Sequence, residues 1–322
     1  MLKKFMAASV LAASLAGFAV PASAADYPSQ PVRLIVSNNP GGPVDLMGRL
    51  LAEKLHERWG QAVIVENRPG ASSIISTNLL AKSKPDGHTL ALVVASAVTI
   101  VPFATKSLPF DPQKDLQPIS MVARTPFLFV VREDSPLKSW KDFEQAARQQ
   151  DLSIGSFSIG TAFHLTWEQV ARQLGIEALY VPTSSSSKTQ SDVVNGQLDI
   201  ALDTPSSARA LIEGGRLRPL ALTGAQRFSG LPDTPTLLEE GVDYAAEPWI
   251  GLMAPAGIDQ TIVDELQQAV AEILQTPDML AQMTILGMVP AASSPAEFQQ
   301  VIDADRQAME PLIKELGISL QP

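Results

Sequence analysis

Hydrophobic and polar positions along the chain predict an alternation of strands with helices. Short apolar runs bounded by Gly, Pro or Asn are typical of buried strands, and between many of them apolar residues recur at helical spacing. Strands are predicted at 33–36, 62–67, 88–96, 116–122, 127–131, 152–156, 178–182, 198–202, 217–222 and 249–254. Helices are predicted at 73–83, 137–149, 232–241, 262–274, 277–286, 295–303 and in a C-terminal segment ending near 316. This alternation predicts an α/β fold with mostly parallel sheets covered on both faces.

The first predicted strand runs into a loop rich in Gly and Pro. Residues 37–45 read Ser-Asn-Asn-Pro-Gly-Gly-Pro-Val-Asp, and behind them Met47, Leu51 and Leu55 fall on one face of a helix. Two glycines allow a tight turn and leave backbone amides uncovered. The helix start adds unpaired N–H groups and the positive end of its dipole. The loop therefore predicts an anion site, and a carboxylate fits it.

A second unit of the same kind lies roughly a hundred residues further on. The strand 152–156 leads into the loop 157–164, and a helix with Trp167 and Val170 on its apolar face ends at Gly175. Two such units suggest two halves of the molecule that offer anion-binding loops to one ligand. The alternative is that each is an ordinary strand-to-helix junction of an α/β protein.

The N-terminus has the pattern of a secretory signal peptide. Lys3 and Lys4 precede an apolar run from 5 to 20, and Ala22-Ser23-Ala24 is a small-residue cleavage site, so residues 1–25 are interpreted as the signal. No cysteine follows for a lipid anchor, and no later stretch approaches the roughly 20 apolar residues of a membrane span. We expect an exported, soluble protein with no direct membrane insertion.

Chain length indicates the number of domains, and net charge limits the classes of partner. At roughly 100–200 residues per domain, what remains after the signal indicates two domains. The full chain carries a net charge of −10, and loss of Lys3 and Lys4 leaves 22 basic against 34 acidic residues, or −12. That balance argues against nucleic acid as a partner. It also means that local amides and dipoles must hold any anionic ligand against the overall field. The chain has no cysteine, which excludes disulfides and thiolate chemistry.

Short motifs spread over the mature chain resemble one family. They are Tyr27-Pro28-Ser29, Pro40-Gly41-Gly42 with Asp45, Val65-Glu66-Asn67-Arg68-Pro69-Gly70, Pro85-Asp86-Gly87, Leu108-Pro109-Phe110-Asp111-Pro112, Gly155-Ser156 with Gly160 and His164, Gly196-Gln197-Leu198-Asp199, Leu231-Pro232-Asp233-Thr234-Pro235-Thr236 and Trp249-Ile250-Gly251-Leu252-Met253-Ala254-Pro255-Ala256-Gly257. In this order they resemble the substrate-binding proteins of tripartite tricarboxylate transporters, also called Bordetella uptake gene proteins.

The resemblance implies a periplasmic, non-enzymatic solute-binding protein of type II, with a ligand cleft between two α/β lobes. On this chain, lobe 1 corresponds to 26–124 plus 248–322 and lobe 2 to 125–247, with hinges near Thr125-Pro126 and Glu247-Pro248. Such proteins bind small organic carboxylates through backbone amides and ordered waters and deliver them to integral membrane transporter subunits. The resemblance further implies a monomer, no cofactor, no metal and no catalytic residue.

The family pattern also implies the ligand-binding residues. Two loops and two strand ends supply them: Asn38, Pro40, Gly41, Gly42, Val44, Asp45, Ser96, Ser158, Gly160, Thr161, Ala162, Phe163, Asp203 and Thr204. Departures from the pattern bear on the ligand class. Val44 stands where relatives usually carry Thr, Ser72-Ser73 where they carry Gly-Gly, and Ser184 lies where a basic side chain is common. The missing basic group argues against a tricarboxylate, and Asn38 and Asn39 predict a polar site for a small polar acid or amide.

Several residues keep two interpretations. Asp45 either contacts an ammonium or hydroxyl group of the ligand or stabilises its own helix start. His164 either donates to the anion or makes a structural hydrogen bond, and Asp203 either holds water near the ligand or forms a turn. Trp167 and Trp249 are interpreted as core residues.

The sequence also bears on two other functional classes. Enzyme motifs fail, because no histidine pair has metal-ligand spacing and neither Ser156 nor Ser158 has the flanking glycines of a nucleophile elbow. A periplasmic hydrolase is therefore disfavoured. A sensor that docks on a membrane signalling protein is the alternative to a transport receptor.

Overall fold

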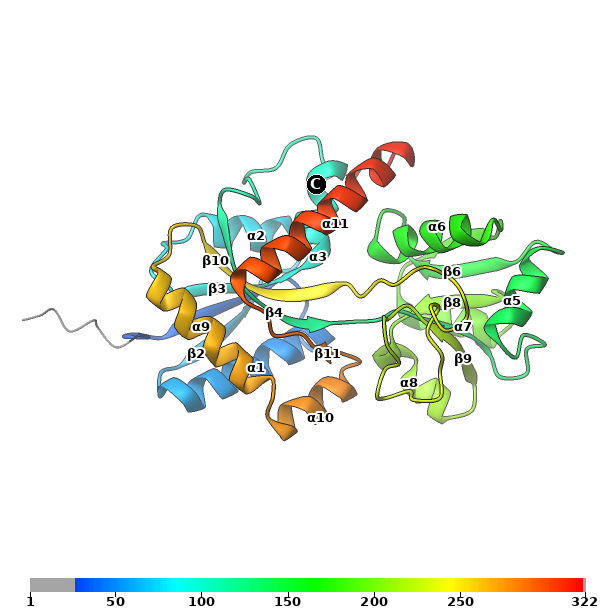
Figure 1. The fold of residues 1–322 in the computed structure, drawn as a ribbon, viewed down its shortest axis with the longest axis horizontal. Coiled ribbons are helices and arrows are strands. Elements are labelled where there is room, and N and C mark those ends of the chain that lie inside the picture. Colours follow the sequence, from blue (N-terminus) through cyan, green and yellow to red (C-terminus); the bar gives the residue numbers. More distant parts are fainter. Residues whose placement is uncertain (1–26, 321–322) are drawn as a thin grey trace, which may run out of the picture.

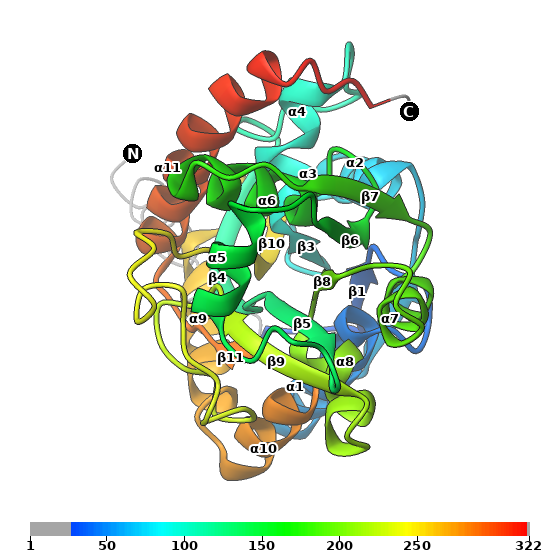
Figure 2. The same cartoon turned by 90° about the vertical axis from the view of Figure 1, so that its right-hand side faces the viewer.

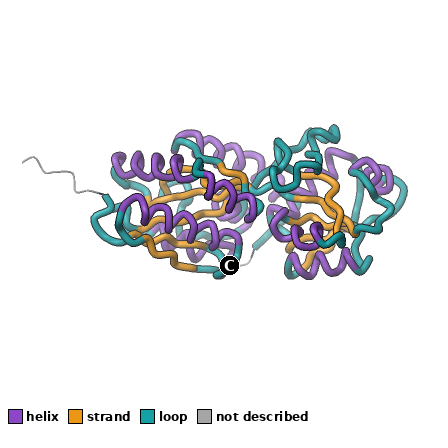
Figure 3. Tube along the Cα trace, turned by 90° about the horizontal axis from the view of Figure 1, so that it is seen from below, coloured by secondary structure: helices purple, strands orange, loops and turns teal. Residues whose placement is uncertain are grey.

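A computed structural model describes residues 27–320, and within them the chain forms two lobes, each built around its own mixed sheet (Figure 1). The strand order is β11-β4-β10-β3-β1-β2 in the first sheet and β7-β6-β8-β5-β9 in the second. Seen from below, the two sheets lie side by side along the long axis with helices packed around each (Figure 3). The predicted signal peptide lies outside the described residues.

The first lobe contains the N-terminal strands and the segment from β10 to the C-terminal helix. Its strands are β1 Val32–Val36, β2 Val63–Asn67, β3 Thr89–Val94, β4 Leu116–Arg124, β10 Trp249–Pro255 and β11 Val289–Pro290. Its helices are α1 Pro43–Trp59, η2 Ala71–Ser73, α2 Ile74–Ala81, α3 Ala95–Thr99, α4 Val101–Ala104, α9 Gln260–Ile273, α10 Pro277–Ile285 and α11 Pro295–Glu315. Apolar faces of α1, α9 and α10 pack on one side of the sheet, and Phe298 and Ile302 of α11 pack on the other.

The second lobe, which faces the viewer in Figure 2, is built from the middle of the chain. Its strands are β5 Leu128–Arg132, β6 Ser153–Phe157, β7 Leu179–Thr183, β8 Ile200–Asp203 and β9 Leu217–Leu222. Its helices are α5 Trp140–Ala147, α6 Ala162–Leu174, α7 Ser186–Val194 and α8 Pro205–Glu213. Phe129, Trp140, Phe143 and Trp167 form an aromatic core with ring centroids 4.8–6.5 Å apart, which confirms Trp167 as a core residue.

Two segments cross between the lobes. One leaves β4 and enters β5 through 125–127, and the other is the end of the long connection 223–248, which turns within the second lobe before it enters β10. The crossings are bonded to each other, because the Thr125 N–H donates to the Pro248 carbonyl at 2.9 Å. At the second lobe, the Phe127 N–H donates to Thr223 Oγ1 at 2.8 Å. The two crossings thus form a paired connection.

The expectation of mostly parallel sheets is wrong. The pairs β1–β2, β1–β3, β6–β7 and β6–β8 are parallel, but β10 runs antiparallel to both β3 and β4, and β5 runs antiparallel to β8 and β9. The reason is the crossings, since a strand that arrives from the other lobe enters its sheet in the opposite direction. Local periodicity carries no information about this.

Three further expectations are corrected. Strand β3 ends at Val94, so Ser96 lies in the short helix α3 rather than at a strand end. Residues 232–241 form turns instead of a helix. The helix predicted at 295–303 and the C-terminal helix are one element, α11, which continues past Pro311 because its apolar side stays buried as far as Leu312 and Ile313.

Among residues 27–320, no helix combines the length and the apolar character that a membrane crossing requires.

Candidate functional site

A cleft of about 610 Å³ lies between the lobes and is lined by residues of both. The N-terminal ends of α1, α6, α7 and α8 open onto it through Val44, Ala162, Ser186 and Ser206. Each helix start presents N–H groups that have no partner within the helix, together with the positive end of the dipole. The cleft is therefore a place where partial positive charge from several directions meets, and none of the described residues that line it is basic.

The structure brings eight of the predicted binding residues to the cleft. They are Asn38, Val44, Ser96, Gly160, Thr161, Ala162, Phe163 and Thr204. The remaining predicted residues do not line it, namely Pro40, Gly41, Gly42, Asp45, Ser158 and Asp203. Of these, Asp45 and Asp203 are buried, whereas Pro40 and Gly41 are exposed to solvent.

Asp45 organises the first loop from within. Its side chain is 1% exposed, and its Oδ2 accepts hydrogen bonds from the Gly41 N–H at 2.8 Å and from Arg49 Nε at 3.0 Å. Its Oδ1 accepts from Asn67 Nδ2 at 2.8 Å, and the same Nδ2 donates to the Asn38 carbonyl at 3.0 Å. The Gly41 amide is therefore taken by Asp45, and of the two interpretations of Asp45 the structural one fits this geometry.

The electrostatics of Asp45 follow from these contacts. Burial raises the pKa of its carboxyl, but the hydrogen bonds from Arg49, Gly41 and Asn67 together outweigh it and lower the pKa to about 2. The carboxylate is thus ionised at neutral pH and held by donors on three sides.

The second loop is held by its own caps. Thr161 is the N-cap of α6, and its Oγ1 donates to the carbonyls of Phe157 and Ser158, each at 2.9 Å. The Gly160 N–H donates to Nδ1 of His164 at 3.4 Å, and burial lowers the pKa of that imidazole. Since His164 is 9% exposed and does not line the cleft, the structural interpretation of His164 fits. The N–H groups of Ala162 and Phe163 remain at the exposed start of α6.

Asp203 connects two helix starts. Its Oδ1 accepts from Ser186 Oγ at 2.9 Å and from the Thr204 N–H at 2.8 Å, and its Oδ2 accepts from Gln190 Nε2 at 2.8 Å. Burial raises the pKa of this carboxyl despite these donors. Asp203 thus fixes the first turns of α7 and α8 against each other from behind the wall.

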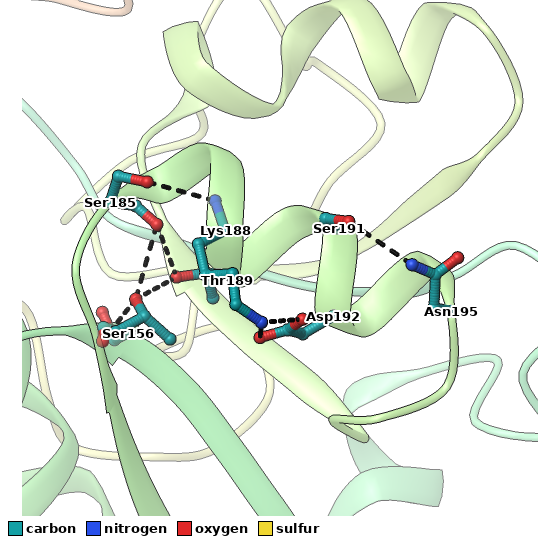
Figure 4. A network of polar contacts seen from close by, with 8 residues as sticks. Ser156, Ser185, Lys188, Thr189, Ser191, Asp192 and Asn195 are labelled. Carbon is teal, nitrogen blue, oxygen red and sulfur yellow. Dashed lines mark hydrogen bonds and ion pairs between the residues drawn. The ribbon is translucent and has the colours of Figure 1, made fainter.

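The start of α7 is a network of hydroxyl groups (Figure 4). Ser185 caps the helix by accepting from the Lys188 N–H at 3.2 Å, and its carbonyl accepts from Thr189 Oγ1 at 3.2 Å. The Lys188 ammonium turns along the helix to the carboxylate of Asp192. Of the Ser184–Ser187 run, Ser184, Ser185 and Ser186 line the cleft, so this segment borders the site.

Sequence reasoning missed other lining residues. Ser72 and Ser73 line the first lobe's side with φ angles of +51° and +72°, values that favour glycine. Phe127 and Phe157 line the second lobe's side, and the Phe127 ring stacks on Phe163 at 4.0 Å. Serines in place of the usual glycines after Pro69-Gly70 could have indicated the strained turn from the sequence. No local pattern distinguishes a Phe in the core from one at the cleft. The wall is more apolar than Asn38 and Asn39 alone predict.

A smaller cavity of about 250 Å³ adjoins the cleft on the side of the crossings. Ser96, Ala162 and Trp249 line both spaces. Trp249 itself is 2% exposed and donates from Nε1 to Asp305 Oδ2 at 2.7 Å, so it is a core residue with one edge toward the site. Arg124, Glu247 and Asp305 bring charge to this smaller cavity. No cluster of potential metal ligands occurs in the described part of the chain.

The C-terminal tail completes the wall. After α11 the Leu320 N–H donates to the carbonyl of Ala104, at the end of α4 in the first lobe, at 2.8 Å, and Leu320 lines the cleft. A Cβ on Gly160 would meet Ile318 Cγ2 at 2.9 Å and Leu320 Cδ2 at 3.3 Å. The tail therefore packs directly on the second loop.

The family model described as "Tripartite tricarboxylate transporter family receptor" (TctC) matches residues 47–318. The chain belongs to this family. The resemblance inferred from the motif series is thereby confirmed, and the TctC family consists of non-enzymatic transporter receptors.

Individual TctC relatives agree in sequence and fold. Protein BugT of Bordetella pertussis is 31% identical over 310 residues, which cover 95% of each chain. The solved structure of R. palustris Rpa4515 with adipate is 31% identical, with a TM-score of 0.78 over 91% of this chain and 99% of that one. MatC of Rhodopseudomonas palustris with bound malate is 25% identical, with a TM-score of 0.72 over 89% of this chain and 100% of that one. Matching structures include periplasmic binding proteins, which confirms the two-lobed fold class.

Proposed function

We propose that this TctC protein is a periplasmic receptor that captures a small organic carboxylate between its lobes and delivers it to an integral membrane transporter. The observation that carries the proposal is the convergence of helix starts from both lobes on one cleft. Relatives solved with adipate and with malate support the ligand class. Export through the N-terminal signal and a monomeric state complete the proposal.

In this proposal the carboxylate lies between the starts of α1 and α6. The Gly41 and Gly160 amides are engaged by Asp45 and His164, so the donors are the first-turn N–H groups of Val44, Ala162 and Phe163. Hydroxyl groups at the starts of α7 and α8 supply further contacts, directly or through water. Such dipolar groups favour an anion without a buried ion pair.

Closure of the lobes turns binding into a signal for the transporter. The paired crossings at Thr125 and Pro248 are the proposed hinge, because they are the extended segments that join the two sheets. A ligand bound to both lobes stabilises the closed arrangement by the difference in its affinity for the two states. The transporter then distinguishes loaded from empty receptor by shape.

The test is a thermal-shift screen of the mature protein against di- and tricarboxylates, amino acids and aromatic acids, followed by solution scattering with each hit. Binding raises the melting temperature by mass action, and closure reduces the radius of gyration. If no carboxylate raised the melting temperature, receptor function for this class would be wrong. A hit that left the scattering curve unchanged would contradict the delivery mechanism.

Matched variants test the site itself. Val44→Glu places a carboxylate at the start of α1 in the cleft, where it repels the ligand while suiting the helix dipole. Leu46→Glu puts the same charge on a 41% exposed position that does not line the cleft. We expect loss of the ligand-induced shift in the first variant and its retention in the second. Retention in both would contradict an anion site at α1.

A further inference from the structure

The described part of the cleft wall has an unusual composition for a site that binds charged ligands. Among the described residues that line it there is no Asp, Glu, Lys, Arg or His, and hydroxyl, amide and apolar groups make up the whole wall. Any charge on a bound ligand is therefore met by peptide N–H groups, hydroxyl groups and helix dipoles alone. This places a limit on how many charges a ligand can carry into the cleft.

Basic side chains that follow the lining segments in sequence have partners outside the cleft. Arg49 lies against Asp45, Arg68 against Glu66 and Lys188 against Asp192. Lys188 belongs to the first turn of α7, but it does not line the cleft, and its ammonium turns along the helix to the carboxylate of Asp192 (Figure 4). These cations are already neutralised, so a ligand that recruited one would have to break an existing pair.

Arg124 is the cation of the adjoining cavity, and it faces two carboxyl groups there. Burial raises the pKa of Glu247 and of Asp305, and the nearby Arg124 offsets only part of that rise. The one guanidinium that the described residues bring to this cavity is thus shared by two carboxyl groups. A carboxylate that reached from the cleft into this cavity would therefore meet repulsion as well as attraction.

Aromatic surface lines the second lobe's side of the cleft. The rings of Phe127 and Phe163 stack with centroids 4.0 Å apart at an interplanar angle of 22°, and both residues line the wall. The Phe157 side chain, which is 43% exposed, also lines it. An aromatic ring in the ligand can extend this stack and bury apolar surface on both partners.

We propose that the cleft selects an organic acid with a single carboxylate on an apolar, aromatic body. This inference rests on the proposed function and adds the charge and the body of the ligand. The single carboxylate is held by the helix starts, and the body lies on the Phe surface. The first carboxylate takes the α1 and α6 starts, so a second one loses its hydration in the cleft and finds only the hydroxyl groups and helix starts of α7 and α8, with no cation beside it among the described residues of the wall.

Isothermal titration calorimetry at pH 7.5, on mature protein unfolded and refolded to remove any retained ligand, tests the inference with matched probes. Benzoate is paired with terephthalate, and hexanoate with adipate, so that each pair differs by one carboxylate. We expect the monocarboxylate to bind at least about tenfold more tightly in each pair, because the extra charge is unpaired. We also expect benzoate to bind more tightly than hexanoate.

The outcomes separate the inference from the function on which it rests. If terephthalate or adipate binds as tightly as its monocarboxylate partner, the inference is overturned and the receptor function stands. If only polar acids such as malate bind, the inference is likewise overturned. If no carboxylate of any kind binds, both fail.

Two variants address the wall directly. Ser184→Arg adds a cation to the wall and should improve adipate relative to hexanoate by about tenfold, whereas Ser187→Arg, on an exposed residue outside the lining, should leave the ratio unchanged. Phe163→Leu should weaken benzoate about tenfold and leave hexanoate nearly unchanged. An unchanged ratio in Ser184→Arg, or an equal loss for both acids in Phe163→Leu, would count against the inference.

Discussion

The Gly41 N–H donates to the Asp45 carboxylate at 2.8 Å across the first loop of the cleft. A residue at the third position of α1 thus holds the loop that precedes the helix, and Asn67 at the end of β2 holds the other carboxylate oxygen at 2.8 Å. The loop therefore has a fixed shape before any ligand arrives. Preorganisation of this kind leaves the ligand less ordering to impose on the protein.

Asp45→Ala should destabilise the fold by about 2 kcal/mol, because it removes the carboxylate that accepts hydrogen bonds from the Gly41 N–H, Arg49 Nε and Asn67 Nδ2. Guanidinium unfolding checks this, with Asp45→Asn as the milder matched change and Arg49→Gln as the control for the exposed partner. We expect affinity to fall for every ligand to a similar extent. A loss confined to amino-acid ligands would instead indicate that Asp45 contacts an ammonium group.

The same carboxylate predicts part of the acid sensitivity. The pKa of Asp45 is about 2 in the folded protein against 3.8 for an unperturbed Asp, so its stabilisation is fully present above about pH 4. It is lost as the pH falls through about 2, and it amounts to about 2 kcal/mol. Unfolding free energies of the wild type and of Asp45→Asn measured between pH 5 and 2 should therefore converge toward the acid end. Parallel curves would contradict the assignment.

Ser72 sits in left-handed backbone at the edge of the cleft, between Ala71 and Ser73, which have positive φ as well. A non-glycine residue there costs about 1–2 kcal/mol, and glycine removes that cost while adding freedom to the unfolded chain. Ser72→Gly should therefore stabilise the protein by about 0.5–1 kcal/mol in chemical denaturation. Ala81→Gly, at the end of α2, is the control and should destabilise by up to about 1 kcal/mol.

Gly160 and Gly41 form a matched pair for the role of the C-terminal tail. Both have positive φ, +80° and +85°, but a Cβ on Gly41 meets nothing within 4 Å, whereas one on Gly160 runs into Ile318 and Leu320. Both Ala variants should lose roughly 1 kcal/mol or more from backbone strain. Only Gly160→Ala should also displace the tail, seen as faster hydrogen exchange at the Leu320 N–H, which donates to Ala104. Equal exchange in the two variants would contradict the tail contact.

Gly287 shows the same close approach on the other side of the cleft. A Cβ there would lie 2.8 Å from the Ser206 backbone nitrogen at the start of α8, so the absent side chain lets the lobes meet. Gly287→Ala should hold the lobes apart. We expect it to lower the affinity for the ligand more than it lowers the stability of the first lobe. Solution scattering of the free protein checks the separation, and an unchanged scattering curve would refute it.

Much of the architecture could be predicted from the sequence alone. The two strand–loop–helix units were predicted because burial of short apolar runs, the glycine turns and the 3.6-residue period are local properties. The motif series indicated the family, and the family indicated both loops. Among the predicted site residues, Val44, Thr161 and Phe163 do line the cleft.

Other features were decided only by the tertiary structure, because they depend on residues distant in sequence. The Asp45 carboxylate is held in part by Asn67, a residue of another strand. Leu320 lines the cleft because the C-terminal tail packs on Gly160. The antiparallel strands follow from the crossings between lobes. The absence of charge from the described cleft wall is likewise a property of which side chains the fold turns inward. Local pattern predicts which segments form strands and helices, whereas long-range packing determines which of their groups face the ligand.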